Sequence, residues 1–517
     1  MLFNSYVFLL AFLPLSLAGF FALSRLSGRA GLVFLLLASL VFYGWWNPAY
    51  LLLLGASIAG NYACGRLIGA AEARPARQGL FLGLGIAANL ALLIRYKYLA
   101  DLLGTLHAAF GSVPTLPAIA LPLGISFFTF TQIGWLIDRR AGLAPAEGPL
   151  AYLLFVTFFP HLIAGPILSN REMIPQFRNP AIARPDGQNL VAGAAIFTIG
   201  LLKKCALADP LGPAAGAGFA APGGLSAFAA WHAVLAYSLQ LYFDFSGYSD
   251  MAIGLARMFN LRFPQNFNAP YRAESVIDYW QRWHMTLTRW LTLYLFNPLA
   301  MAAARRRGAR GQIPERPGAT SLGGFTETLA MPLLVTMTLA GIWHGSGWQY
   351  LLFGLWHAAL LTVNHAWRCF GPRRPSSRRP ARLCRVALTY LGVLVGTVLF
   401  RAPSDGAAWA MLAAMAGRHG VRHVALPFIA SDGHGLLVGA SLVAAGHHAV
   451  AWLWLGGLYA IIFLAPTTQQ IMGEAGKGAA SRLRFRLSLP WALAGGVAAM
   501  AALLSVGGTS EFLYFQF

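Results

Sequence analysis

A run of 18 residues without a single charge lies near the start of the chain: Tyr6-Val-Phe-Leu-Leu-Ala-Phe-Leu-Pro-Leu-Ser-Leu-Ala-Gly-Phe-Phe-Ala-Leu23. About 20 apolar residues in a helix cross the hydrocarbon of a bilayer. The run therefore predicts a transmembrane helix. Because no basic stretch precedes it and no small-residue cleavage site follows it, we expect the first span of the protein rather than a removed signal peptide.

Similar apolar runs recur along the whole chain of 517 residues. The composition is 57% hydrophobic and only 11% charged, whereas soluble domains carry about 25% charged residues. We therefore predict an all-α polytopic membrane protein, a single integral membrane domain over residues 1–517, with roughly ten to thirteen transmembrane or re-entrant helices. The further runs are Gly31–Trp46, Gly79–Ile94, Leu116–Ile137, Leu190–Leu207, Phe228–Phe259, Leu329–Trp343, Gln349–Val363, Val386–Phe400, Gly435–Phe463 and Leu489–Leu504.

The net charge of +21 is concentrated in a few basic loops. The main ones cover residues 303–320 and 368–385, and two apolar segments separate them, so an even number of crossings returns the chain to one face. The positive-inside rule places such loops in the cytoplasm, and it does the same for Arg25 and Arg29 after the first span. We expect membrane lipid, not nucleic acid, as the partner of this charge. The four scattered cysteines predict neither a disulfide framework nor a metal site.

The segment Leu241-Tyr-Phe-Asp-Phe-Ser-Gly-Tyr-Ser-Asp250 carries more polar groups than a lipid-facing helix tolerates. Asp244 and Tyr248 are four residues apart, as are Ser246 and Asp250, so each pair shares a helix face. A carboxylate inside the membrane is costly and should face the bundle interior or a water-filled cavity. The face either holds the helices together through hydrogen bonds or lines a substrate path, and both interpretations can hold.

A second polar region follows at Ser275-Val-Ile-Asp278, which has the form of a capping box. It predicts one helix from Asp278 to Trp290, with Asp278 and Arg282 paired at i,i+4. The tryptophans of this helix are typical of an anchor at the headgroup level. That interpretation does not explain His284.

His344 ends an apolar run within Gly341-Ile-Trp-His-Gly-Ser-Gly347. Small neighbours allow a substrate or another backbone to approach closely. Apolar surroundings keep imidazole neutral, and neutral imidazole can act as a general base. A single buried histidine is also a common packing group, so the residues alone leave both interpretations open. The chain has no GxSxG elbow, P-loop or HExxH motif.

The order of several motifs resembles the membrane-bound O-acyltransferase family, and within it the alginate O-acetylase type. The resemblance runs almost from end to end. The matching blocks are Phe3–Leu9, Leu123–Phe130, Phe158–Pro166, Gly200–Asp209, Tyr242–Gly254, Phe263–Tyr271, Trp280–Leu287, Gly341–Gly345 and Phe512–Phe517.

This resemblance implies a reaction centre with two histidines, His344 and His284, inside a tunnel or funnel. It makes Asp244, Ser246, Tyr248, Asp250 and Trp343 candidates for the tunnel lining. It also implies an acetyl thioester donor such as acetyl-coenzyme A, reached from the cytoplasm, with no bound cofactor and no metal.

We therefore expect a bacterial inner-membrane O-acetyltransferase that supplies acetyl groups to an exopolysaccharide, with alginate as the first candidate. A separate periplasmic acetyltransferase is the implied partner. Acetylation of cellulose or peptidoglycan and D-alanine transfer to teichoic acid are alternatives on the same scaffold. A transporter without chemistry and a structural subunit are the alternatives from other classes. His161 and Thr467 depart from the family pattern and leave the polymer open.

Overall fold

Every regular element of the computed structural model is helical within the described residues, which are 1–111, 114, 120–144, 148–312, 321–371, 379–421, 448–474, 483–507 and 512–513. The predicted all-α class is confirmed. Parts of the predicted runs Leu116–Ile137 and Gly435–Phe463 lie outside these residues, as does most of the Phe512–Phe517 motif.

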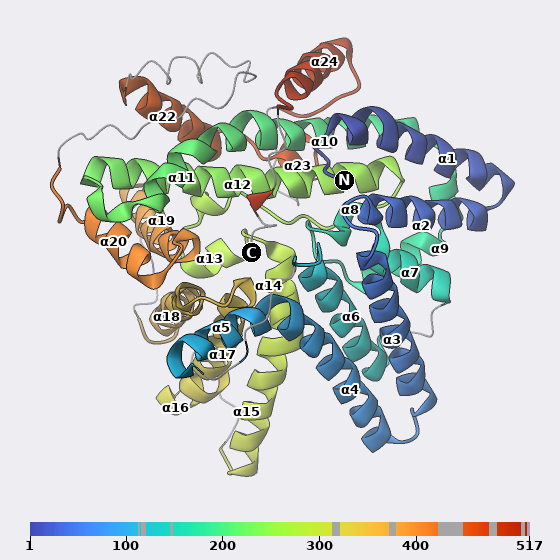
Figure 1. Ribbon diagram of the computed structural model, residues 1–517, viewed down its shortest axis with the longest axis horizontal. Coiled ribbons are helices and arrows are strands. Elements are labelled where there is room, and N and C mark those ends of the chain that lie inside the picture. Colours follow the sequence, from blue (N-terminus) through green and yellow to red (C-terminus); the bar gives the residue numbers. More distant parts are fainter. Residues whose placement is uncertain are drawn as a thin grey trace. The chain divides into compact units, whose positions relative to one another are not determined.

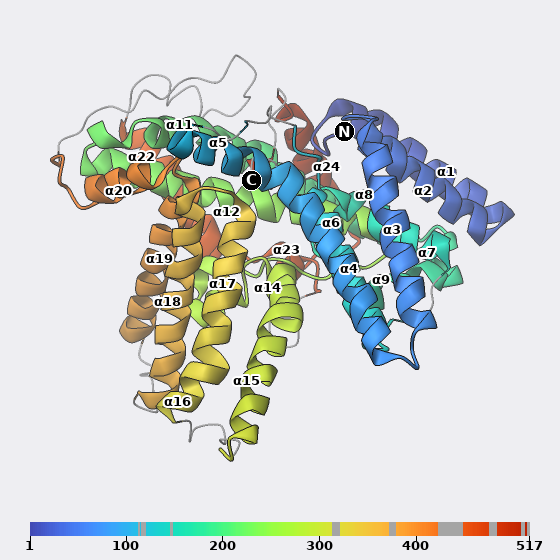
Figure 2. The ribbon, with the colours of Figure 1, turned by 60° about the horizontal axis from the view of Figure 1, so that its bottom comes forward.

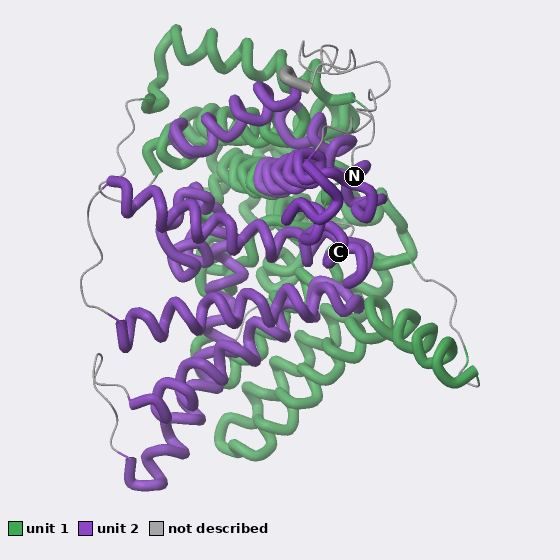
Figure 3. The backbone as a smooth tube through the Cα atoms, turned by 90° about the vertical axis from the view of Figure 1, so that its left-hand side faces the viewer, with its two compact units in different colours: residues 1–205, 245–265, 468–516 green, residues 206–244, 266–467, 517 purple. Residues whose placement is uncertain are grey.

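The chain divides into two compact units that interleave in sequence (Figure 3). Unit 1 comprises residues 1–205, 245–265 and 468–516, and unit 2 comprises residues 206–244, 266–467 and 517. A single domain over residues 1–517, and a tunnel or funnel at its centre, stay predictions.

Unit 1 contains a packed group formed by α3, α4 and α6, which lie side by side in Figures 1 and 2. Helices α1 and α2 form a second pair. The α-helices that lie wholly in this unit are α1 (Leu13–Leu26), α2 (Gly28–Gly44), α3 (Tyr50–Ala70), α4 (Pro75–Leu93), α5 (Leu99–Phe110), α6 (Ile125–Arg140), α7 (Pro149–Thr157), α8 (Phe159–Leu162), α9 (Asn170–Arg178), α10 (Gly187–Leu202), α23 (Thr468–Ile471) and α24 (Leu489–Leu504).

Helix α3 is a candidate span that the hydrophobic runs did not predict. Asn61 interrupts its apolar sequence, but the side chain is buried and bonded to Asn89 of α4 in both directions, at 3.3 Å and 2.6 Å. Paired amides satisfy each other away from water. The polar residue that hid α3 in the sequence therefore joins it to α4.

Unit 2 is built around α17, α18 and α19, which run side by side (Figure 2). Its α-helices are α11 (Gly212–Ala220), α13 (Val276–Trp280), α14 (Met285–Leu291), α15 (Asn297–Ala309), α16 (Leu322–Phe325), α17 (Met331–His344), α18 (Trp348–Phe370), α19 (Arg379–Arg401), α20 (Asp405–Met415) and α22 (His448–Leu464). Short 3₁₀ and π turns join many of the helices of both units.

Six helical segments within the described residues are long and apolar enough to cross a membrane. Three shorter apolar helices cover Gly28–Gly44, Ala451–Leu464 and Leu489–Leu504. The polytopic character predicted from the sequence is thus confirmed. The six are Val7–Leu26, Tyr50–Ala70, Pro75–Phe110, Gly187–Ala220, Leu322–His344 and Arg379–Arg401.

Helix α12 (Ala227–Met258) is the longest α-helix of the described chain, 32 residues or about 48 Å at 1.5 Å per residue. Its residues up to Asp244 belong to unit 2 and those from Phe245 to unit 1. Nearly the whole helix is buried, including its polar side chains. This burial agrees with the expectation that the polar residues of the segment avoid lipid.

The basic residues before and after the α17–α18 hairpin lie at the same end of that hairpin. Arg305, Arg306 and Arg307 lie on the last turns of α15 rather than in the predicted loop, and Arg307 pairs with Glu327 near the start of the Leu322–His344 span at 3.2 Å. The rings of Phe325, the last residue of α16, and Phe370, the last residue of α18, contact each other at 5.4 Å. This arrangement agrees with the even number of crossings predicted between the two basic segments.

Candidate functional site

His344 lies at the C-terminal end of α17, where Gly345 leaves the helix in an extended conformation. The side chain is buried among three rings of the same unit, those of Trp343, Phe353 and Phe400, at 4.6, 5.9 and 4.9 Å. The span that it ends is 23 residues long, which is about 34 Å of helix. His344 is therefore at the opposite end of the hairpin from the basic residues.

The glycines around His344 bring two backbones together. A Cβ on Gly341 would come within 2.8 Å of Gly354 Cα on α18 and closer still to the carbonyl oxygen of Tyr350. Real side chains do not tolerate such distances to backbone atoms. The sequence allowed either a substrate or another backbone to approach these glycines, and at Gly341 it is another backbone that does so.

The second histidine marks a break in the predicted helix. Ser275 caps α13 as expected, accepting a hydrogen bond from the Asp278 N–H at 3.1 Å, and Asp278 pairs with Arg282 at 2.7 Å. The helix then ends at Trp280, and α14 begins at Met285. The prediction of one helix from Asp278 to Trp290 is wrong, because His284 adopts a left-handed conformation with φ +42°.

Asn266 holds this break in place. Its side-chain oxygen accepts hydrogen bonds from the Thr286 N–H at 3.3 Å and the Thr286 hydroxyl at 2.9 Å, and it lies 3.1 Å from Nδ1 of His284. The Met285 N–H donates to the Asn266 carbonyl at 2.9 Å. Asn266 of the Phe263–Tyr271 motif therefore joins that motif to Trp280–Leu287 within unit 2. The sequence showed both motifs but gave no role to Asn266.

These contacts fix the tautomer of His284. The backbone N–H of Thr286 can only donate, so the Asn266 atom that it meets is the oxygen. That oxygen can only accept, so Nδ1 of His284 carries the proton and Nε2 carries the basic lone pair. Burial lowers the pKa of His284 to about 3, because desolvation disfavours the imidazolium. The ring is neutral near pH 7.

A third buried histidine, His357 on α18, escaped the sequence analysis. Its Nδ1 accepts a hydrogen bond from Nε1 of Trp280 at 3.3 Å. The sequence held a signal for it, since Gly354-Leu-Trp-His357 repeats the pattern of Gly341-Ile-Trp-His344.

Aromatic rings connect His344, His357 and His284 within unit 2. The path leads from His344 through Phe353 to His357, and from there through Tyr279, Trp283 and Phe267 to His284. Successive ring centroids along it are between 4.8 and 6.4 Å apart. The histidines predicted from two distant motifs thus belong to one aromatic cluster, in which Phe353 and Trp283 are half-buried and the other rings are buried.

The polar residues of α12 are buried in different surroundings. Asp244 lies in unit 2 and is 2% exposed. In unit 1, Tyr248 packs between Phe3 and Phe512, at 4.9 and 4.3 Å. The Ser246 hydroxyl is buried and has no hydrogen-bond partner within the described chain.

Asp250 belongs to a network of charges and hydrogen bonds in unit 1. It pairs with Lys203 at 2.6 Å and accepts hydrogen bonds from Thr468 at 2.6 Å and Gln469 at 3.0 Å. These contacts favour the interpretation that Asp250 helps to hold the helices together through hydrogen bonds. A role of Asp244, Ser246, Tyr248, Asp250 or Trp343 in lining a tunnel stays a prediction.

Comparisons with known proteins bear on this arrangement. The model of MBOAT, the membrane-bound O-acyltransferase family, matches residues 143–311. The chain is 39% identical over 420 residues to the probable alginate O-acetylase AlgI of Azotobacter vinelandii, which covers 80% of this chain and 78% of the relative.

The names of two further relatives specify other substrates. The chain is 36% identical over 454 residues to the peptidoglycan O-acetyltransferase of Helicobacter pylori, which covers 81% of each chain. It is 27% identical over 281 residues to the teichoic acid D-alanyltransferase of Bacillus subtilis, covering 54% of this chain and 68% of the relative.

Proposed function

Because this chain belongs to the membrane-bound O-acyltransferase family, we propose that it transfers acetyl groups from a cytoplasmic thioester for O-acetylation of an exopolysaccharide, with alginate as the first candidate. It is an O-acyltransferase, a multi-pass protein of the bacterial inner membrane, and it transfers acyl groups to a glycan.

The observation that carries the proposal is the shared aromatic cluster of His344 and His284. Aromatic walls exclude water, which keeps imidazole neutral and leaves a lone pair able to accept a proton. The tautomer of His284 is fixed by Asn266, and a left-handed backbone at a residue other than glycine costs about 1–3 kcal/mol. The fold maintains this conformation with the contacts of Asn266, as expected of a side chain that must be aimed.

In the proposed reaction, His344 takes the proton of an acceptor hydroxyl as the oxygen attacks the carbonyl carbon of the acetyl thioester. The new C–O ester bond forms while the C–S bond breaks. The proton passes from His344 to the leaving thiolate, which departs as the free thiol. His284 orients the acceptor or stabilises the developing charge. The donor, acetyl-coenzyme A or another acetyl thioester, is a substrate in this scheme.

The place of His344 on the hairpin supports transfer across the membrane. Arg307 at the Arg-rich end of α15 pairs with Glu327, which is 17 residues or about 26 Å of helix before His344. The positive-inside rule assigns that end to the cytoplasm. His344 would then face the periplasmic half, and a cytoplasmic thioester would have to extend toward it. A periplasmic acetyltransferase that completes the reaction on the sugar is the partner that this topology suits.

The test replaces His344 with alanine in the chromosome of the source bacterium. Loss of a general base costs about 10²–10⁴-fold in rate, so ester-linked acetyl on the glycan should fall to background while the protein stays in the membrane at its normal level. Acetyl content at the wild-type level would refute the role of His344.

The polymer is decided in the same strains by measuring acetyl on purified exopolysaccharide and on peptidoglycan separately. Peptidoglycan is the second candidate because the Helicobacter pylori relative covers this chain as fully as the alginate-type relative does. If His344→Ala removes acetyl only from peptidoglycan, then peptidoglycan and not alginate is the acceptor.

A further inference from the structure

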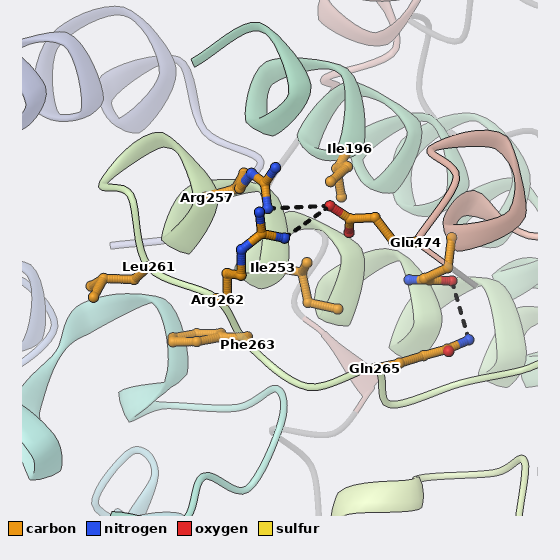
Figure 4. Close-up of a pocket in the computed structure, with 9 residues that line it drawn as sticks. Ile196, Ile253, Arg257, Leu261, Arg262, Phe263, Gln265 and Glu474 are labelled. Atoms are coloured by element: carbon orange, nitrogen blue, oxygen red, sulfur yellow. Dashed lines mark hydrogen bonds and ion pairs between the residues drawn. The ribbon is translucent and has the colours of Figure 1, made fainter. Parts of the chain in front are cut away.

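A pocket is lined entirely by residues of unit 1 (Figure 4), whereas the histidine cluster consists of residues of unit 2. It forms where α12 ends and the chain continues through Leu261–Gln265, and the segment after α23 closes its other side. It encloses about 200 Å³. Its polar wall consists of Arg257, Arg262, Gln265, Gln469 and Glu474, and its apolar wall of Ile196, Ile253, Leu261 and Phe263.

The two arginines of this pocket share one carboxylate oxygen. Oε1 of Glu474 lies 3.3 Å from Nη1 of Arg257 and 3.7 Å from Nη1 of Arg262, as the dashed lines of Figure 4 show. Both distances exceed the 2.7–2.9 Å of a good charge-assisted hydrogen bond. Two guanidinium groups with ten N–H donors between them therefore meet this carboxylate loosely.

Arg257 is poorly satisfied for a half-buried cation. Its side chain is 15% exposed, and its Nε is buried without a hydrogen-bond partner in the described chain. The negative charge of Asp186 attracts Arg257 from a distance. The Asp186 carboxylate, however, already caps α10 by accepting hydrogen bonds from the N–H groups of Gln188 and Asn189. A buried unpaired donor is costly, so an incoming anion with several acceptor oxygens would be stabilised here.

The walls of the pocket are held rigidly. Gln469 donates to Asp250, which also holds Lys203 and Thr468. The backbone of Arg262 is fixed on both sides by the Gln176 amide, at 2.7 Å and 3.0 Å. A rigid site loses less conformational entropy when a ligand binds, because its side chains and loops are already ordered.

The pocket lies on the side of unit 1 that the positive-inside rule assigns to the cytoplasm. Phe259, one residue beyond α12, contacts Phe20 of α1 at 5.5 Å, and α1 ends six residues later at Leu26. Arg25 lies in the last turn of α1 and Arg29 in the first turn of α2. Basic residues after a first span mark the cytoplasmic face.

We propose that this pocket binds the phosphate group of an anionic ligand from the cytoplasmic side, with Arg257 and Arg262 as the anion-binding pair. Guanidinium groups match phosphate oxygens in a bidentate geometry. The pocket is smaller than the roughly 300–1,000 Å³ of a complete small-molecule site, so it holds the phosphate and one adjoining group against the apolar wall. Glu474 competes with the phosphate for both arginines and, being 30% exposed, can turn outward.

The proposal predicts opposite effects on the affinity for phosphate when the charge of Arg262 or that of Glu474 is removed. Inorganic pyrophosphate is titrated into the full-length protein in a nonionic detergent, at constant ionic strength, and binding is followed by calorimetry. Arg262→Gln should weaken binding by roughly ten- to hundredfold, the value of one charge-assisted hydrogen bond. Glu474→Gln should strengthen it, because the competing carboxylate is gone. Arg262 is suited to this test because its side chain is 67% exposed and the fold depends on it little.

The control is Arg184→Gln, which removes an equal charge from an exposed position of unit 1 outside the pocket lining. This variant should bind pyrophosphate as the wild type does. Absence of saturable binding in the wild type, equal losses in Arg184→Gln and Arg262→Gln, or weaker binding in Glu474→Gln would each overturn the proposal.

Two competitors identify the source of the phosphate. A short-chain phosphatidylglycerol in the micelle represents a lipid headgroup, and coenzyme A represents a soluble phosphate ester. Displacement of pyrophosphate by either one supports the site and names its source, and displacement by neither refutes a phosphate-ester ligand. The measurement uses binding alone, so its result is independent of the proposed acetyl transfer.

Discussion

Gly341→Ala tests whether the close approach of α17 and α18 places His344. An alanine Cβ would lie 2.8 Å from Gly354 Cα, with the Tyr350 carbonyl oxygen closer still. Carbon atoms pack at about 3.5–4.0 Å, so α18 must retreat by about 0.7–1.2 Å. The obstacles are backbone atoms, which no rotamer change can move away.

The expected loss follows from that displacement. Overpacking costs about 1–3 kcal/mol of stability, and a misplacement of about 1 Å can lower a rate by roughly 10²-fold. His344 is one turn from Gly341 and moves with it. We expect Gly341→Ala to accumulate in the membrane at a reduced level and to lose most glycan acetylation per molecule of protein.

The matched control is Gly456→Ala in α22 of the same unit, where an added Cβ meets nothing within 4 Å. There alanine favours the helix by up to about 1 kcal/mol. Both variants are compared by quantitative immunoblot and by ester-linked acetyl on the glycan. Equal acetylation per molecule in the two variants would refute the link between this contact and the site.

Three further predictions concern charge and topology. Burial keeps the pKa of His284 near 3, below the ordinary value of about 6.5. Between pH 6.5 and about pH 3 the unfolded chain therefore binds a proton that the folded chain does not bind. The free energy of unfolding falls as the pH falls through that range. His284→Asn, which tolerates the left-handed backbone, should reduce the slope of thermal midpoint against pH between 7 and 4.5, and an unchanged slope contradicts the buried neutral ring. Asp250→Ala should cost at most about 3–5 kcal/mol, the value for a fully buried pair, by leaving the half-buried Lys203 without its carboxylate. Lys203→Met in the same chain should restore part of that loss. A thermal midpoint in Asp250→Ala equal to that of the wild type would argue against the network. Native Cys384, which is exposed on α19, should react with a membrane-impermeant thiol reagent only in inverted vesicles. Ser346→Cys, beyond the end of α17, should react only in intact cells with a permeabilised outer membrane. Labelling of both cysteines from one side would disprove their placement on opposite faces of the membrane.

The sequence predicted the class of fold because membrane spans depend on hydrophobic length, which composition records directly. It missed α3 because the polarity of Asn61 is balanced only by Asn89 in three dimensions. It placed Arg305–Arg307 in a loop because arginine runs commonly mark loops, although arginine itself favours helices.

The site was predictable in part. The cap at Ser275 depends on local chemistry and was confirmed. The break at His284 was not predictable, because helical spacing continues through Trp280–Trp290 and only the contacts of Asn266 stop the helix. For the same reason the sequence assigned no role to Asn266 or His357, whose partners lie 18 to 77 residues away along the chain.

Release of free thiol from acetyl-coenzyme A by purified protein tests the proposed chemistry most directly. In the absence of the true acceptor, a histidine base beside a bound thioester can activate water, so the wild type should release thiol slowly. His344→Ala should abolish that release, and Asp244→Asn should only weaken it because the amide keeps the shape of the carboxylate. Equal background release by all three proteins, in a preparation that acetylates its glycan when the partner is added, would contradict an enzyme that performs the transfer itself.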